Sequence, residues 1–187
     1  MMSTVATYAK ARASQVWSWA LWDWGTSAFS VVITTFVFPI FIVQAAFSAD
    51  GKNTNVLDAN FTWAYVASGV IVAVLAPILG QRADRSRKTK TWLGLNTFIV
   101  GLATILMVFL IPDSSHFAIG LILYVIANVF YEFAFVNYNT VLVQITNPRN
   151  IGRVSGFGWG LGYVGGIVVL LIALAGFILG DPPYWFG

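Results

Sequence analysis

Charged residues are scarce in this chain, and cysteine is absent altogether. Only 9% of the 187 residues are Asp, Glu, Lys or Arg, while 58% are hydrophobic and the mean hydropathy is +0.79. A typical soluble domain has about a quarter of its residues charged. This composition therefore excludes a soluble globular domain. The lack of cysteine excludes disulfides, zinc fingers and thiol nucleophiles.

Enzymatic motifs are also absent. The sequence contains no HExxH pair, no GxSxG elbow and no Walker loop. The single histidine, His116, has no neighbouring ligands and does not indicate a metal site. We therefore expect neither an enzyme nor a bound cofactor.

The apolar residues form continuous runs long enough to cross a membrane as helices. About 20 apolar residues span a bilayer core, and continuous runs of this length differ from the alternation of a membrane barrel. The sequence thus predicts an all-α membrane protein with a single domain over residues 1–187. Five transmembrane helices are expected, at about residues 16–47, 61–80, 92–111, 117–145 and 154–179.

The basic residues predict which side of the membrane each loop faces. Residues 80–90, GQRADRSRKTK, hold five of the ten Lys and Arg residues and lie between two apolar runs. With this turn in the cytoplasm, Lys52 is the one basic residue on the opposite side. Because Lys and Arg are enriched in cytoplasmic loops, we expect a cytoplasmic N-terminus. This topology accounts for the net charge of +3 without a nucleic-acid partner.

Four separated segments resemble the major facilitator superfamily, in particular the branch of autophagy-linked vacuolar amino-acid effluxers and their bacterial relatives. They are SWALWDWGTSAF at residues 18–29, GQRADRSRKTKTW at 80–92, NVFYEFAFVNYN at 128–139 and RVSGFGWGLGYVGG at 153–166. The resemblance implies two halves of six helices, each half built from inverted three-helix repeats. The five expected spans would be most of the first half, and the absence of a sixth span suggests a truncated N-terminal half.

The basic turn resembles the GxxxDRxGRR signature of that superfamily, matched at Gly80, Asp84 and Arg85 and departing from it at Arg87. The resemblance implies that Asp84 and Arg85 belong to a charge network that latches the two halves in one conformation, with Gly80 in the same latch segment. The alternative is a solvated turn whose charges only set the topology. We favour that alternative for the remaining basic residues of the turn.

Glu132 is the most informative single residue, because it lies near the middle of the fourth expected span. An ionised side chain there costs about 2.5–3.5 kcal/mol on insertion scales unless it is paired or hydrated. At 100° per residue, polar and aromatic residues share its helix face. We expect this face to line a solute cavity, with Glu132 binding a cationic group or a proton; the alternative is a packing residue. The other candidate cavity residues on this helix are Asn128, Asn139, Tyr131 and Tyr124.

Two further features of the sequence carry site predictions. Asp23, flanked by four tryptophans, is a candidate to contact the solute or to pair with a gating residue; the alternative is an interfacial acid. Gly158, Gly162 and Gly166 recur at intervals of four, which predicts close packing of the fifth span against another helix.

These features favour a secondary transporter that moves a small organic solute, by resemblance an amino acid, by alternating access. The alternative is a non-transporting membrane fragment that needs the missing C-terminal half. Expected partners are membrane lipid, the solute, a coupling proton and that half. By resemblance, we expect the location to be the inner membrane of a bacterial cell.

Overall fold

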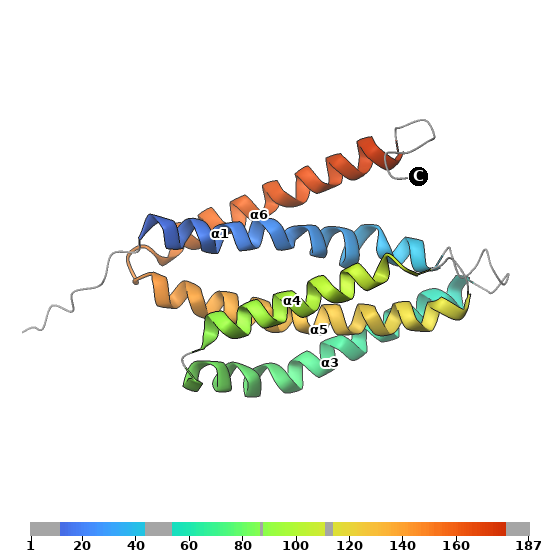
Figure 1. The fold of residues 1–187 in the computed structure, drawn as a ribbon, viewed down its shortest axis with the longest axis horizontal. Coiled ribbons are helices and arrows are strands. Elements are labelled where there is room, and N and C mark those ends of the chain that lie inside the picture. The colour runs from blue at the N-terminus through green and yellow to red at the C-terminus, as the bar shows by residue number, and fades with distance from the viewer. Residues whose placement is uncertain (1–11, 44–53, 87, 111–113, 179–187) are drawn as a thin grey trace, which may run out of the picture. The chain divides into compact units, whose positions relative to one another are not determined.

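The structure is a computed structural model, and it describes residues 12–43, 54–86, 88–110 and 114–178 (Figure 1). All regular structure in these ranges is helical. Five helical segments in them are long and apolar enough to cross a membrane: Ala13–Val43, Val56–Arg82, Thr89–Met107, His116–Ile145 and Ile151–Gly176. The fold class expected from the sequence is therefore confirmed.

The first span is not a uniform α-helix. It consists of α1 (Ala13–Ala28), the π-helix η1 (Phe29–Phe36) and a further helical segment over residues 38–43. In η1 the Thr35 hydroxyl donates to the Ser30 carbonyl over 2.9 Å, five residues back. Pro39 follows closely, and proline removes a donor and crowds the preceding turn. The irregularity thus lies before Pro39, whereas α1 continues through Asp23 and Gly25 without a break.

The second span, α3 (Thr54–Ser86), is longer at both ends than the sequence predicts. It begins within the polar stretch expected as a loop, and it continues through Gly80 into the expected basic turn. Pro77 lies inside this helix without ending it, which is common in membrane helices, where neighbouring groups compensate the lost hydrogen bond. The helix is longer than expected because its backbone hydrogen bonds continue through polar residues once the helix has formed.

The other spans follow the expected pattern with shifted ends. They are α4 (Thr89–Met107), α5 (Ser114–Ile145) and α6 (Ile151–Ala173), the last extended by the π-turn η2 (Leu174–Ile178). Between α5 and α6, the Asn147 N–H donates to Oδ1 of Asn150 over 2.7 Å, and the Arg149 N–H donates to Oδ1 of Asn147 over 3.0 Å. These side-chain bonds close a short turn where the sequence predicts one.

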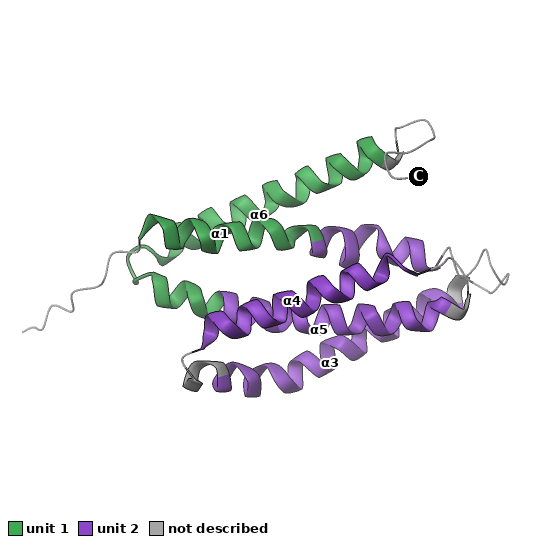
Figure 2. Cartoon of the chain, in the orientation of Figure 1, with its two compact units in different colours: residues 1–28, 139–187 green, residues 29–138 purple. Residues whose placement is uncertain are grey.

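The chain divides into two compact units. Unit 1 contains residues 1–28 and 139–187, and unit 2 contains residues 29–138, as Figure 2 shows. In unit 1, α1 packs along α6. In unit 2, the second part of the first span, α3, α4 and most of α5 share one hydrophobic core.

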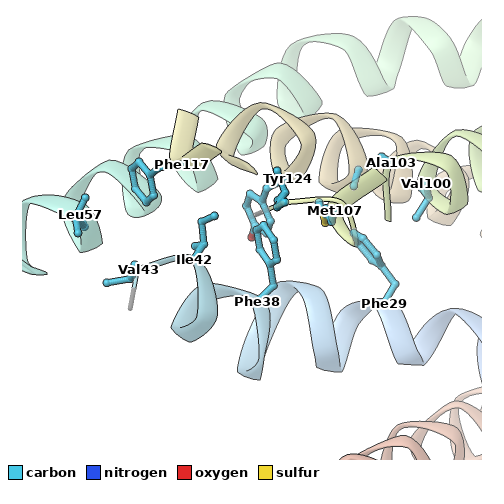
Figure 3. Close-up of a cluster of buried hydrophobic side chains, with 12 residues drawn as sticks. Phe29, Phe38, Ile42, Val43, Leu57, Val100, Ala103, Met107, Phe117 and Tyr124 are labelled. Atoms are coloured by element: carbon cyan, nitrogen blue, oxygen red, sulfur yellow. The ribbon is translucent and has the colours of Figure 1, made fainter. Parts of the chain in front are cut away.

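The core of unit 2 is rich in aromatic side chains. Figure 3 shows Phe29 and Phe38 projecting from the first span toward side chains of α4 and α5, with Met107 and Tyr124 among them. The Phe38 and Tyr124 rings are stacked, with centroids 6.1 Å apart and planes 6° apart. Many large apolar side chains elsewhere are exposed, as expected for surfaces that contact lipid.

Candidate functional site

The predicted polar face of α5 contains two fully packed residues, and Asn128 is the first of them. Its Nδ2 donates to Oγ of Ser68 on α3 over 2.8 Å, and both side chains are buried. The Ser68 hydroxyl in turn donates to the Tyr65 carbonyl over 2.7 Å. Asn128 therefore links α5 to α3 in unit 2.

Ser68 was not among the residues selected from the sequence. It is a single hydroxyl within a long apolar run, and such residues in membrane helices often bond across to a neighbouring helix. That isolation is the signal that marks it as a candidate. The partner on the other helix is not visible in the sequence.

Tyr124 is the second packed residue of this face. Its side chain is fully buried, and its ring contacts Phe61 at a centroid distance of 4.7 Å in addition to the stack with Phe38. The buried Tyr124 hydroxyl has no hydrogen-bond partner within the described residues. Tyr131 lies further along the same face of α5. It is partly buried, and its ring packs against that of Phe29 with centroids 4.9 Å apart.

Glu132 and Asn139 are partly buried, in contrast to the packed residues at the start of the face. Glu132 lies in unit 2 and Asn139 in unit 1, on the same continuous helix. The Glu132 carboxylate has no ion-pair partner among the residues that the structure describes. An intramembrane carboxylate without such a partner has free acceptor capacity for a proton or a cationic group.

Helical periodicity alone does not separate a cavity face from a packing face on α5. Asn137, which the 100° rule places on the opposite side from Glu132, is also buried and donates from Nδ2 to the Phe133 carbonyl over 2.8 Å. Its amide is thus satisfied within its own helix. Burial on several sides makes α5 a central element of the fold.

Asp23 lies in unit 1, on α1, and its side chain is partly buried. The carboxyl group points at α6: a methyl group added to Gly162 would lie 2.7 Å from Oδ2 of Asp23. The sequence predicts Asp23 and Gly162 as separate candidates and does not indicate that they are in contact. In the structure they lie side by side.

Three glycines of α6 are the residues for which the sequence predicts close helix packing. Gly158, Gly162 and Gly166 are all buried, and Gly165 is buried with them. Gly165 was missed because it breaks the four-residue interval. A methyl group there would lie 2.5 Å from the backbone carbonyl oxygen of Trp24, so α1 and α6 approach each other at backbone distance.

The predicted latch residues do not form a turn. Gly80, Asp84 and Arg85 all belong to the helix α3, and the side chains of the last two lie outside the described residues. A methyl group at Gly80 would meet Cγ1 of Val136 at an ordinary 3.6 Å. Gly80 thus lies beside α5, and nothing in its surroundings requires glycine.

The described part of the chain contains no cluster of three or more acids or histidines able to hold a metal ion. The amides and hydroxyls of the candidate site residues can form hydrogen bonds, and the carboxylates of Asp23 and Glu132 can form ion pairs.

Comparison with known protein families shows to which family the chain belongs. Residues 3–170 match the model of the Major Facilitator Superfamily. The chain belongs to this superfamily. It is also 36% identical over 163 residues to the uncharacterized MFS-type transporter YxiO of Bacillus subtilis (strain 168), covering 87% of this chain. No solved structure matches it.

The chain is a multi-pass membrane protein of a transporter family. It spans 37% of the length of the curated relative that it matches. The resemblance to the amino-acid effluxer branch goes further than the comparisons and remains a prediction.

Proposed function

We propose that the complete protein is a secondary active transporter that exports or imports a small organic solute, an amino acid by resemblance, by alternating access. The observation that carries the proposal is a partly buried carboxylate, Glu132, within a membrane span of a transporter-family protein. Charged groups at such positions are costly and mark solute or ion pathways. Glu132 binds the cationic group of the solute or a coupling proton.

The neighbouring groups on α5 support this role. Asn128 keeps an amide oxygen for a polar group of the solute while its nitrogen bonds Ser68. Tyr124 keeps an unbonded hydroxyl within unit 2. Tyr131 supplies an aromatic wall, and Asn139 extends the polar face along the helix.

The same proposal includes the setting of the protein. The N-terminus lies in the cytoplasm, the membrane is the bacterial inner membrane, and Gly80, Asp84 and Arg85 act as a conformational latch in the assembled transporter. Support comes from the distribution of basic residues and from the signature match.

A second proposal concerns the 187 residues by themselves. The chain spans 37% of the length of its curated relative, and alternating access in this superfamily uses two halves. We infer that these five spans alone do not transport and need a C-terminal half.

The experiment for both proposals is uptake into proteoliposomes. The complete protein and the 187-residue chain are reconstituted separately and tested against a panel of labelled amino acids with and without an imposed proton gradient. Transport by the complete protein alone supports both proposals. Lack of transport of every amino acid contradicts the substrate class, and transport by the 187 residues contradicts the second proposal.

A further inference from the structure

The contact between α1 and α6 in unit 1 depends on the absence of side chains at two positions of α6. A methyl group at Gly162 or Gly165 would overlap atoms of α1 at 2.5–2.9 Å, closer than side-chain carbons approach other atoms in folded proteins. The neighbouring Gly156 and Gly160 have open space around them instead. Glycine is therefore required on one face of α6 and replaceable on another.

The space left by Gly162 is filled by an acidic side chain. The point that a Cβ of residue 162 would occupy lies 2.7 Å from Oδ2 and 2.9 Å from Cγ of Asp23, and 3.2 Å from Oγ of Ser27. Any side chain at 162 would displace the carboxyl group from this place. At Gly165, by contrast, the closest group is the Trp24 backbone.

The surroundings leave the Asp23 carboxylate without a strong partner. The hydroxyls of Thr26 and Ser27 donate to backbone carbonyls of α1, at 2.8 and 2.7 Å, rather than to the carboxylate. The nearest basic residues along the two packed helices are Arg12 and Arg153, roughly 16 and 14 Å away along the helix axes at about 1.5 Å per residue. Within the described part of unit 1, this acid has no ion pair.

The rest of the described part of unit 1 adds no second acid to this region. Tyr163, next to Gly162, is exposed on the other side of α6 at 69% of its surface. The α5 segment in this unit, residues 139–145, has no charged side chain. Among the residues of unit 1 that the structure describes, Asp23 is thus the single acid, and its carboxyl group lies against Gly162.

We propose that Gly162 is a positioning residue for Asp23: by leaving its own side-chain volume empty, it holds the Asp23 carboxylate at a fixed place beside Ser27, where the carboxylate binds a cationic group such as an ammonium. This inference rests on the proposed transport function, in which such a cation belongs to the solute. Gly162 acts through Asp23 and does not itself touch the solute.

The test uses the natural lack of cysteine in this chain. Ser27→Cys places a thiol beside Asp23, and its reaction rates are measured with cationic aminoethyl and anionic sulfonatoethyl methanethiosulfonate, each rate divided by that of the same reagent with a free thiol in solution. Each reaction forms a mixed disulfide and releases methanesulfinate, so only the charge differs. We expect a cation preference of about tenfold, from attraction over ~6 Å at a partly hydrated site.

Four variants in the Ser27→Cys background separate the effect of the charge of residue 23 from the effect of its position. Asp23→Asn removes the preference because it removes the charge, and Gly162→Ala reduces it to a similar level although the charge remains. Gly160→Ala is the matched control and leaves the preference unchanged, because its added methyl group meets nothing. If the Gly162→Ala variant does not fold, Asp23→Glu replaces it. The longer glutamate side chain cannot fit the space at Gly162, so the cation preference should fall although the charge is retained.

Several results would overturn the proposal. They are a cysteine that reacts with neither reagent, a preference that survives Asp23→Asn, and a preference that survives both Gly162→Ala and Asp23→Glu. Uptake by the complete protein separates this outcome from that of the proposed function. If no amino acid is transported but the preference depends on Gly162, the positioning stands and the transport proposal fails.

Where transport is found, the Asp23→Asn and Gly162→Ala variants give a second test. Both should raise the KM of a cationic solute, and the double variant should match Asp23→Asn alone, because displacing a missing carboxylate has no further effect. Multiplying effects would show a structural role for Gly162 and contradict the proposal.

Discussion

Nδ2 of Asn128 donates a hydrogen bond to Oγ of Ser68 over 2.8 Å, joining two helices at a point where both side chains are buried. This bond restrains the rotation of α5 against α3. It also limits what Asn128 can offer a solute, since one of its polar atoms is already bonded.

Asn128→Ala and Ser68→Ala should each destabilise the complete protein. Interhelical hydrogen bonds in membranes are worth about 0.6 kcal/mol on average and about 1.7 at most. Ser68→Ala also removes the hydrogen bond from Ser68 to the Tyr65 carbonyl, so the bond between the two side chains is measured by the coupling and not by the single variant. A double-mutant cycle on the free energy of unfolding in detergent mixtures should show positive coupling in this range. Thr104→Val is the control, because its hydroxyl bonds the Val100 carbonyl within its own helix; coupling of zero between Asn128 and Ser68 would contradict the link.

Tyr124→Phe should leave the free energy of unfolding unchanged within about 0.5 kcal/mol, because the hydroxyl forms no hydrogen bond to the described residues. Phe38→Ala, which removes the stacked partner ring, should cost about 3 kcal/mol. If transport falls in Tyr124→Phe while stability stays constant, the hydroxyl serves the solute. A large stability loss would show that the hydroxyl is bonded in the native protein.

Three glycine-to-alanine substitutions should rank by what the added methyl group meets. Gly165→Ala meets a backbone oxygen at 2.5 Å, which cannot rotate away, and should cost about 1–3 kcal/mol. Gly120→Ala meets the flexible tip of Ile42 at 2.6 Å and should cost less, and Gly101→Ala meets nothing and should stabilise its helix by up to about 1 kcal/mol. Thermal unfolding in detergent measures the order, and a tolerated Gly165→Ala would contradict the close approach of α1 and α6.

The predicted topology is open to cysteine labelling, since the chain has no native cysteine. Cysteines at Asn53 and Ser114 should react with an impermeant maleimide added to intact cells, whereas one at Ser86 should react after the cells are opened. Labelling of Ser86 from outside would invert the orientation.

The spans were predictable because length and continuous hydropathy are local properties of the sequence. The π-helix over residues 29–36 was not, because it depends on how the first span accommodates Pro39 while packing its phenylalanines. The helical conformation of Asp84 and Arg85 was also missed, since a family signature suggested a turn where backbone hydrogen bonding continues.

Candidate residues were predictable one at a time, but their contacts were not. Glu132 and Asp23 stand out as acids in apolar runs. That Asn128 bonds Ser68, 60 residues away, and that Asp23 fills the space of Gly162 are tertiary relationships. Helical spacing says which residues share a face, and only the packed structure says what that face meets.

The most direct test of the transport account is solute uptake by the complete protein carrying Glu132→Gln. Glutamine keeps the shape and removes the charge, so uptake should fall at least about tenfold, since a hydrogen bond to a charged group is worth about 1.5–3 kcal/mol. Membrane insertion and uptake by the control Asp58→Asn, an exposed acid near the start of α3, should stay at the level of the unaltered protein. Unchanged transport by Glu132→Gln would contradict the account.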